Sequence, residues 1–312
     1  MSKQNIPVFF AIDDNYVPFL AVALESLVAN ISEENFYEIR VLYTQLNEKH
    51  QKALKKYERA NVSVEFVDLT EKITRIANKL YTRDYFSITT YYRLFLPDLY
   101  PNLQKALYLD SDIVLLADVA KLYNTDIGTN LVGAIPDGAI LSVKEFADYA
   151  ELVVGIQDYH NYFNAGIMIM NLEELRNYRF QVKFMYLLDT IKFKVAQDQD
   201  YLNRLCKGRV TLIDLSWNTM PGANPEFRSK NPKLIHYNLS NKPWHLDDVP
   251  LEEHFWDFAW QTDFYDEIRK IKDNYTEKER QEDIETGIRL ISLAAKEADC
   301  VGDDRKNRGE NG

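Results

Sequence analysis

The chain has 312 residues, of which 46% are hydrophobic and 27% charged, the balance of a folded protein long enough for one large α/β domain or two smaller ones. Its formal net charge of −11 disfavours nucleic acid as a partner. Two cysteines, Cys206 and Cys300, fit neither a disulfide framework nor a zinc site, and no apolar run approaches the roughly 18 residues of a membrane span, so a cytoplasmic protein is expected.

The first seventy residues alternate between strand-like and helix-like patterns. The opening run IPVFFAI is continuous, as in a buried parallel strand, and Asp13 and Asp14 interrupt it too soon for a signal peptide. Asn15 is the expected cap of the next helix, in which Pro18 falls in the first turn. The patterns predict strands at 6–12, 38–44 and 62–69 and helices at 15–30 and 47–60. This βαβαβ order predicts a parallel sheet with right-handed crossovers.

The middle of the chain continues with helices and short strands. Ser87 can cap a helix whose apolar face is Ile88, Tyr92, Phe95 and Leu96. Further strands are expected at 105–110, 131–137, 162–172, 209–217 and 233–239, and further helices at 172–178, 179–193 and 198–208.

The composition shifts near residue 251, where the sequence becomes helical. The last helix carries Ile284, Ile288, Ile291 and Ala295 at helical spacing. Membrane-surface helices are normally basic, whereas this one is acidic to neutral, so packing on the domain or on a second copy in a homodimer is expected. The predicted organisation is a domain over 1–250, a helical extension over 251–300 and a disordered tail over 301–312.

The segment KALYLDSDIVLLAD places two carboxylates, Asp110 and Asp112, at the end of a predicted strand. Residues i and i+2 of an extended segment point the same way, so the two carboxylates repel unless a cation lies between them. A divalent metal would relieve that repulsion at the sheet edge where α/β folds bind ligands. The alternative is a pair of solvated aspartates in a turn.

Four other segments are weaker candidates when each is taken alone. Asp13 and Asn15 follow the first strand, where they could bind a ligand or merely cap a helix. Gly166 of Asn-Ala-Gly suggests close backbone approach or a strand-entry turn, and the acidic run at 198–200 is also ordinary at a helix start. His236 and Lys242 offer a metal ligand and a phosphate-binding cation, although a lone histidine is more often structural.

Together, and in this order, the segments resemble glycosyltransferase family 8. The motifs are AIDDNY, SITTYYRL, LYLDSDIVL, YFNAGIMIMNL, DQDYLN and HYNLSNKPW, and the resemblance spans roughly residues 6–245. It is nearest to the bacterial lipo-oligosaccharide α-galactosyltransferases, and glycogenin-type enzymes are more distant.

The resemblance implies a GT-A nucleotide-diphospho-sugar transferase fold, a Rossmann-like mixed sheet flanked by helices, with a C-terminal helical extension. It also implies a UDP-sugar donor, Mn²⁺ (with Mg²⁺ as the alternative), and a glycan, glycolipid or glycoprotein acceptor, at a site that is cytoplasmic or peripheral to the inner face of the membrane. The implied metal ligands are Asp110, Asp112 and His236; the donor-binding residues are Ala11, Asp13, Asn15, Arg93, Ser111, Asn164, Ala165, Asp198, Gln199 and Lys242; and Asp137 is on the acceptor side.

Two positions depart from the family pattern. Tyr85 stands where histidine is usual, which puts that donor contact in doubt, and Leu239 stands where glycine is usual. Glycine there would let the backbone approach phosphate closely, so the loop around Leu239 is expected to differ or to use a neighbouring amide.

The family retains anomeric configuration, and its motif places Gln199 nearest the anomeric carbon. An amide is a poor nucleophile, so front-face attack is expected, with Gln199 and Asp198 as the catalytic-site residues, rather than a double displacement. Galactose is favoured as the donor sugar, and glucose is next. Two alternatives remain: a phosphohydrolase of the haloacid-dehalogenase type, in which the first aspartate of D-x-D accepts a phosphoryl group, and a non-catalytic nucleotide-sugar-binding protein.

Overall fold

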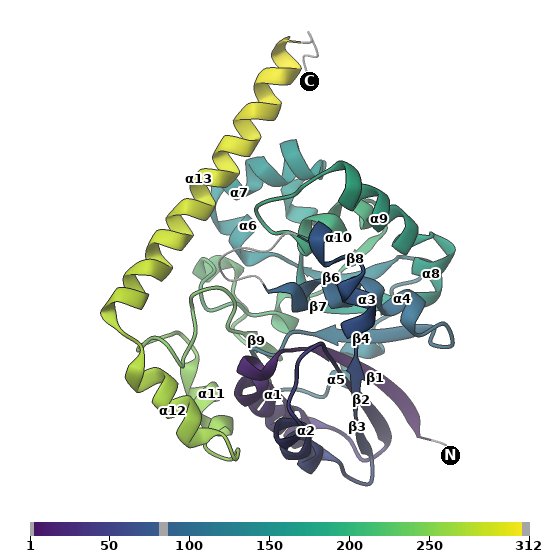
Figure 1. Cartoon of the computed structure of the whole chain (residues 1–312), viewed down its shortest axis with the longest axis vertical. Helices are drawn as coiled ribbons and strands as arrows, with labels where there is room; N and C mark the ends of the chain where they lie inside the picture. Colours follow the sequence, from purple (N-terminus) through teal and green to yellow (C-terminus); the bar gives the residue numbers. More distant parts are fainter. Residues whose placement is uncertain (1–2, 81–86, 308–312) are drawn as a thin grey trace.

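A mixed seven-stranded sheet flanked by helices forms the centre of the molecule in the computed structural model, which describes residues 3–80 and 87–307 (Figure 1). Its strand order is β3-β2-β1-β4-β7-β6-β8. The strands are β1 (Gln4–Ala11), β2 (Asn35–Tyr43), β3 (Val62–Asp68), β4 (Lys105–Leu109), β6 (Val132–Pro136), β7 (Phe163–Asn171) and β8 (Val210–Leu212). The predicted α/β class and mixed sheet are confirmed.

The strands β1 to β4 are parallel, whereas β7 runs antiparallel to both of its neighbours, β4 and β6. After β3 the chain crosses to the other side of β1 to form β4, so the strand order reverses between these two strands. Such a reversal opens a crevice beyond the carboxyl ends of the strands. The end of β1 at Ala11 and the residues after β4 therefore face the same ligand-binding edge.

Side chains of the central strands belong to two hydrophobic clusters, one on each face of the sheet. In β1, Val8 and Phe10 belong to one cluster and Phe9 and Ala11 to the other, as the two-residue period of a strand requires. Burial on both faces explains why the strands read as continuous apolar runs.

The helices that surround the sheet are mostly short. They are α1 (Val17–Asn30), α2 (Glu48–Leu54), α3 (Thr70–Thr74), α4 (Leu96–Leu99), α5 (Val119–Tyr123), α6 (Gly138–Ser142), α7 (Lys144–Tyr149), α8 (Leu172–Asn177), α9 (Phe180–Thr190) and α10 (Asp198–Cys206). Pro18 lies in the first turn of α1, as predicted. Asn15 is not its cap: a 3-10 turn, Asp14–Tyr16, precedes the helix, and the backbone N–H of Asn15 donates to Asp13 Oδ1 at 3.0 Å.

The segment Ile88–Phe95 is a 3-10 helix rather than the α-helix that was expected. Ser87 caps it as predicted, since its Oγ accepts from the N–H of Thr89 at 3.2 Å. Three residues per turn align positions i and i+3, so Tyr91 and Leu94 are buried although the α-helical pattern left them off the apolar face.

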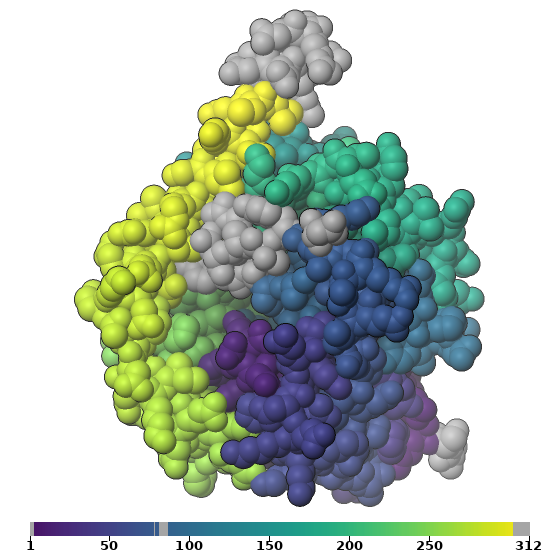
Figure 2. All heavy atoms as spheres, in the orientation of Figure 1, coloured from purple at the N-terminus to yellow at the C-terminus, as the bar shows by residue number. Residues whose placement is uncertain are grey.

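Three helices form the C-terminal extension: α11 (Glu252–Ala259), α12 (Tyr265–Asn274) and α13 (Glu277–Asn307). Figure 2 shows α12 and α13 along one side of the body. The predicted extension is confirmed, and α13 continues past the expected boundary at residue 300. No helix within 3–80 and 87–307 is both long enough and apolar enough to cross a bilayer.

Of the four residues that the sequence analysis singled out on α13, Ile291 packs against the core of the domain and Ala295 is partly buried. Ile284 and Ile288 are 52% and 58% exposed, whereas Leu290, Ala294 and Ala298 are buried. The helix packs against α7 through this stripe, whose small residues permit close approach. The predicted face therefore overlaps the contact only in part, and Ile284 and Ile288 lie outside it.

Candidate functional site

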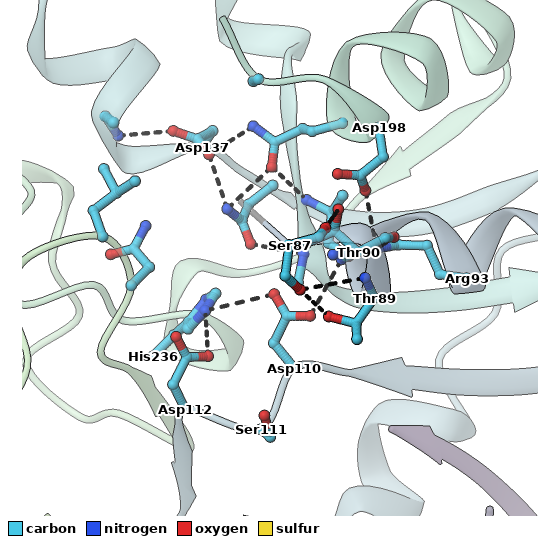
Figure 3. Close-up of a pocket in the computed structure, with 18 of the residues that line it drawn as sticks. Ser87, Thr89, Thr90, Arg93, Asp110, Ser111, Asp112, Asp137, Asp198 and His236 are labelled. Atoms are coloured by element: carbon cyan, nitrogen blue, oxygen red, sulfur yellow. Dashed lines mark hydrogen bonds and ion pairs between the residues drawn. The ribbon is translucent and has the colours of Figure 1, made fainter. Parts of the chain in front are cut away.

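A cavity of about 260 Å³ lies at the crevice between β1 and β4 and collects most of the predicted site residues (Figure 3). The predicted residues that line it are Ala11, Arg93, Asp110, Ser111, Asp112, Asp137, Asn164, Ala165, Asp198, Gln199, His236 and Lys242. Asp13 and Asn15 belong to the adjoining turn and do not line the cavity. Tyr85 lies outside the described residues.

Asp110, Asp112 and His236 form a compact group whose candidate ligand atoms all lie within 4.8 Å of one another. His236 Nε2 is 3.2 Å from Asp112 Oδ1 and 3.8 Å from Asp110 Oδ2. A separate two-stranded sheet brings them together: β5 (Ile113–Leu115) pairs antiparallel with β9 (Leu234–His236), and Ile113 lies opposite His236. This pairing places the aspartates beside a histidine that follows them more than a hundred residues later in the sequence.

Asn218 orients the histidine and was missed by the sequence analysis. His236 Nδ1 lies 3.0 Å from Asn218 Oδ1, and a proton on Nδ1 would leave the Nε2 lone pair facing the two carboxylates. Asn218 Nδ2 in turn donates to Asn164 Oδ1 at 3.0 Å. Asparagine in an irregular segment carries no periodic signal by which it could have been found.

Gly166 leaves the room that this group occupies. A Cβ at this position would lie 2.5 Å from Asp110 Oδ2 and 2.6 Å from His236 Cε1. The close approach that the Asn-Ala-Gly segment suggested is therefore an approach to the side chains of Asp110 and His236, two of the candidate metal ligands. Two partly exposed carboxylates and a buried imidazole, grouped at one end of a cavity, suit a divalent cation such as Mn²⁺ or Mg²⁺.

We expect Gly166→Ala to weaken Mn²⁺ binding at least about tenfold, because the new methyl group must displace Asp110 or His236. Titration of Mn²⁺ followed by electron paramagnetic resonance measures the effect. Gly287→Ala is the matched control: a Cβ there meets no atom within 4 Å, and alanine should stabilise α13 by roughly 0.5–1 kcal/mol. Unchanged Mn²⁺ affinity in Gly166→Ala would refute the packing argument.

Lys242 lies against the metal-ligating group and is 6% exposed. Its ammonium donates to Asp112 Oδ2. Burial alone would raise the pKa of Asp112, but the charge of Lys242 and the hydrogen bonds from Lys242 and His236 outweigh it and hold that pKa below its usual range. The carboxylate therefore stays ionised and able to bind a cation.

Leu239, in the loop that leads to Lys242, adopts the left-handed conformation with φ of 52°. This is a backbone region that glycine enters freely and leucine enters at a cost of roughly 1–2 kcal/mol. Leu239 lines the cavity in this conformation, and the prediction that the loop differs or uses a neighbouring amide stays a prediction.

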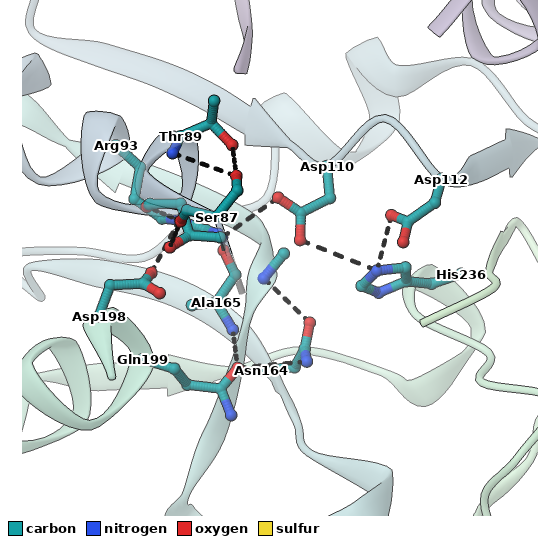
Figure 4. Close-up of polar contacts among 12 residues, drawn as sticks. Ser87, Thr89, Arg93, Asp110, Asp112, Asn164, Ala165, Asp198, Gln199 and His236 are labelled. Atoms are coloured by element: carbon teal, nitrogen blue, oxygen red, sulfur yellow. Dashed lines mark hydrogen bonds and ion pairs between the residues drawn. The ribbon is translucent and has the colours of Figure 1, made fainter. Parts of the chain in front are cut away.

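Arg93 is buried between two carboxylates, with only 4% of its side chain exposed (Figure 4). Its Nη1 lies 3.3 Å from Asp110 Oδ1, and its Nε lies 3.0 Å from Asp198 Oδ2. The guanidinium also donates to the carbonyls of Thr90 and Ala165 and stacks over Tyr108, whose ring centroid is 4.5 Å away. Arg93 thus links the metal-ligating group to the start of α10.

Gln199, Asn164 and Asp137 form a hydrogen-bonded network beside that group. Gln199 Oε1 accepts from the N–H of Ala165 at 2.9 Å, and its Nε2 donates to Asp137 Oδ2 at 3.1 Å. Asn164 Nδ2 donates to the same Asp137 oxygen at 2.9 Å. Asp137 Oδ1 accepts two backbone N–H groups at the start of α6, so this carboxylate positions its neighbours.

Asp198 and Asp200 open α10 from a strained residue, Gln197, whose φ is 48°. Burial raises the pKa of Asp198 to about 6, although Arg93 opposes the shift. Asp198 Oδ2 is buried and accepts no hydrogen bond among the described residues, because the nearby Arg93 Nε–H points to Thr90. The oxygen is nevertheless ion-paired with Arg93, whose Nε lies 3.0 Å away.

Asp200 is structural, since it accepts from the hydroxyls of Tyr149 and Tyr162 at 2.9 and 2.7 Å. Burial raises its pKa to about 6. The folded state therefore holds this proton more tightly than the unfolded state, whose pKa is near 3.9. The resulting stability is fully present below about pH 4 and is lost as the pH rises through about 6.

We therefore expect Asp200→Asn to lose less stability than the wild type between pH 4 and pH 7. The difference in unfolding free energy between the two proteins should narrow by up to about 3 kcal/mol over that range. Urea unfolding at several pH values measures it, and Asp257→Asn, at an exposed position of α11, is the control. Parallel pH profiles for wild type and Asp200→Asn would contradict the prediction.

Comparison with known proteins agrees with the sequence resemblance. The model of "Glycosyl transferase family 8" matches residues 7–248. The chain is 31% identical over 253 residues to a Haemophilus influenzae protein whose name assigns it provisionally to the glycosyltransferases. The matched region covers 78% of this chain and 74% of that protein. It is 26% identical over 268 residues to an Escherichia coli lipopolysaccharide 1,2-glucosyltransferase, again covering 78% and 74%.

Two solved structures share the fold. The bifunctional glycosyltransferase WbbM has a TM-score of 0.75 and 26% identity over 87% of this chain and 52% of that chain, so this chain spans about half of that protein. The galactosyltransferase LgtC, solved with donor and acceptor sugar analogs, has a TM-score of 0.65 and 28% identity over 83% of this chain and 96% of that one. The expected GT-A fold is thereby confirmed.

Proposed function

The chain belongs to glycosyl transferase family 8, and on that premise we propose that it is a retaining hexosyltransferase that uses a UDP-sugar and Mn²⁺. The observation that carries the proposal is the group Asp110, Asp112 and His236, which shares one cavity with the cations Arg93 and Lys242. The acceptor would be a glycan, glycolipid or glycoprotein.

Galactose is the favoured donor sugar and glucose the next. The similarity to the galactosyltransferase LgtC supports galactose, and the similarity to lipopolysaccharide 1,2-glucosyltransferase supports glucose. The two sugars differ by one epimeric hydroxyl group, so a few hydrogen bonds in the pocket decide between them.

Asp110, Asp112 and His236 would hold the divalent cation, and Gly166 provides the space for them. A bound cation would act as a Lewis acid on the diphosphate leaving group. Arg93 and Lys242 place two further positive charges in the same cavity, where they would stabilise the negative charge that develops as UDP departs.

The residues at the sugar end favour front-face attack. A double displacement needs a carboxylate nucleophile close to the anomeric carbon. Asp137 is occupied by four hydrogen bonds, from Asn164, Gln199 and two backbone N–H groups, and Gln199 itself is an amide. In this scheme Asp198 accepts a hydrogen bond from a sugar hydroxyl, and the amide dipole of Gln199 stabilises the oxocarbenium-like transition state.

A screen of UDP-sugars for UDP release in the presence of Mn²⁺ tests the proposal and identifies the sugar. We expect turnover with UDP-galactose or UDP-glucose, and no phosphate release from phosphomonoesters with Mg²⁺. Binding of UDP-sugars without any turnover would favour a non-catalytic binding protein, and phosphate release would favour a phosphohydrolase.

A further inference from the structure

One end of the cavity is apolar, in contrast to the metal-ligating end. Its walls are Ala139 and Ile140 of α6, Phe146 of α7, Val195 before α10, and Leu290 of α13. The last four are each less than a tenth exposed and belong to the same hydrophobic cluster. None of the five carries a charge.

This apolar end adjoins the Asp137–Gln199 network. The backbone N–H groups of Ala139 and Ile140 donate to Asp137 Oδ1 at 2.9 and 3.1 Å, and the other oxygen of Asp137 accepts from Gln199. A molecule lying against α6 therefore has one edge at Gln199. The diphosphate of a donor would lie beside the candidate metal ligands Asp110, Asp112 and His236.

The helix α13 contributes a wall that lies outside the family-matched region, which ends at residue 248. Its cavity-lining residues, Asp283 and Leu290, are seven residues apart. Seven residues make almost two turns and about 10 Å of helix, so both side chains lie on one face. Ile284 and Ile288 project from the helix elsewhere and are largely exposed.

Contacts on both sides of the cavity hold α13 in place. Before the helix, Tyr275 stacks on His245 with ring centroids 4.3 Å apart, and its hydroxyl donates to Asp283. Farther along, Glu297 accepts from Lys194 at 2.7 Å, in the segment that carries Val195. Figure 2 shows α13 lying along the body over this stretch. Leu290 is thus a fixed part of the wall.

We propose that the apolar end is an acceptor subsite, in which Leu290 and Phe146 contact the C–H face of a neutral sugar and α13 helps to set acceptor specificity. This inference rests on the proposed transfer reaction. An acceptor hydroxyl must reach the donor sugar near Gln199, and the surface next to that point is apolar. An acidic sugar would find no positive side chain among these five residues, whereas the C–H face of a neutral sugar gains from apolar burial.

Saturation-transfer NMR with simple methyl glycosides, in the presence of UDP and Mg²⁺, tests the subsite directly. We expect methyl β-galactoside or methyl β-glucoside to bind, and methyl β-glucuronide to bind more weakly. Leu290→Trp should raise the Kd of the neutral glycoside, relative to the Kd of UDP, at least about tenfold by filling the subsite. Ile288→Trp, at a 58% exposed position on the same helix, should leave that ratio unchanged.

The proposal would be overturned if Leu290→Trp changed glycoside binding no more than Ile288→Trp does. It would also be overturned if Leu290→Trp raised the Kd of UDP as much as the Kd of the glycoside. Ala139→Phe narrows the same end from α6 and tests the subsite independently if Leu290→Trp fails to fold. Glycoside binding is measured without turnover, so a failed UDP-release screen would count against the reaction alone. Turnover with glycoside binding that neither variant weakens would count against the subsite alone.

Discussion

Asp112→Asn should lower the rate of UDP release at least about 100-fold, because a bound metal contributes several kcal/mol to stabilising the charge of the transition state and each 1.36 kcal/mol is a factor of ten. Asp112 is 12% exposed at its side chain, lies 3.2 Å from His236 Nε2 and accepts from Lys242. The amide would remove one of three candidate metal ligands and the counter-charge of a buried ammonium. UDP release at saturating donor over a series of Mn²⁺ concentrations measures the loss.

The control for Asp112→Asn is Asp158→Asn, at a carboxylate 55% exposed that pairs with His160 outside the cavity. Excess Mn²⁺ should partly restore Asp112→Asn, since Asp110 and His236 remain. Turnover within tenfold of the wild type at ordinary Mn²⁺ concentrations would contradict the assignment of Asp112 as a metal ligand.

The sheet and the two aspartates were predictable from the sequence because both rest on local patterns. Continuous apolar runs marked β1 and β4, and the i, i+2 spacing placed Asp110 and Asp112 on one side of an extended segment. Their proximity to His236 depends on the pairing of β5 with β9, two strands of three residues each. Nothing local predicts such a pairing: taken alone, His236 was a weak candidate ligand, and only the family motif joined it to the two aspartates.

Other features were not predicted from the sequence, for identifiable physical reasons. A 3-10 helix at Ile88–Phe95 has a different period from the α-helix that was assumed, so its buried face was only partly predicted. The contact of α13 was only partly predicted, because it includes Ala294 and Ala298 beside Leu290 and Ile291, whereas Ile284 and Ile288 are exposed. Leu239 holds a left-handed backbone conformation that its residue type does not predict.

Removal of the Arg93 guanidinium should be the most destabilising single change at the site. Arg93→Met would leave Asp110 and Asp198 without their shared cation and the carbonyls of Thr90 and Ala165 without a donor. Breaking a buried ion pair by removing one partner costs about 3–5 kcal/mol. We expect a loss of that size in the unfolding free energy from urea titration at pH 7. Arg204→Met, at an exposed arginine that donates to the carbonyl of Val154, should lose much less.

A loss of charge pairing predicts a coupling between Arg93 and Asp198 that a simple loss of packing does not predict. If the cost of Arg93→Met comes from carboxylates left without a partner, then Asp198→Asn should offset part of it, and the double variant should lose less stability than the sum of the single variants. Arg93→Lys should rescue only part of the stability, because one ammonium cannot reach two carboxylates and two carbonyls from a single position. Strict additivity of Arg93→Met and Asp198→Asn, or full rescue by lysine, would show that Arg93 stabilises the site by packing over Tyr108 rather than by its charge.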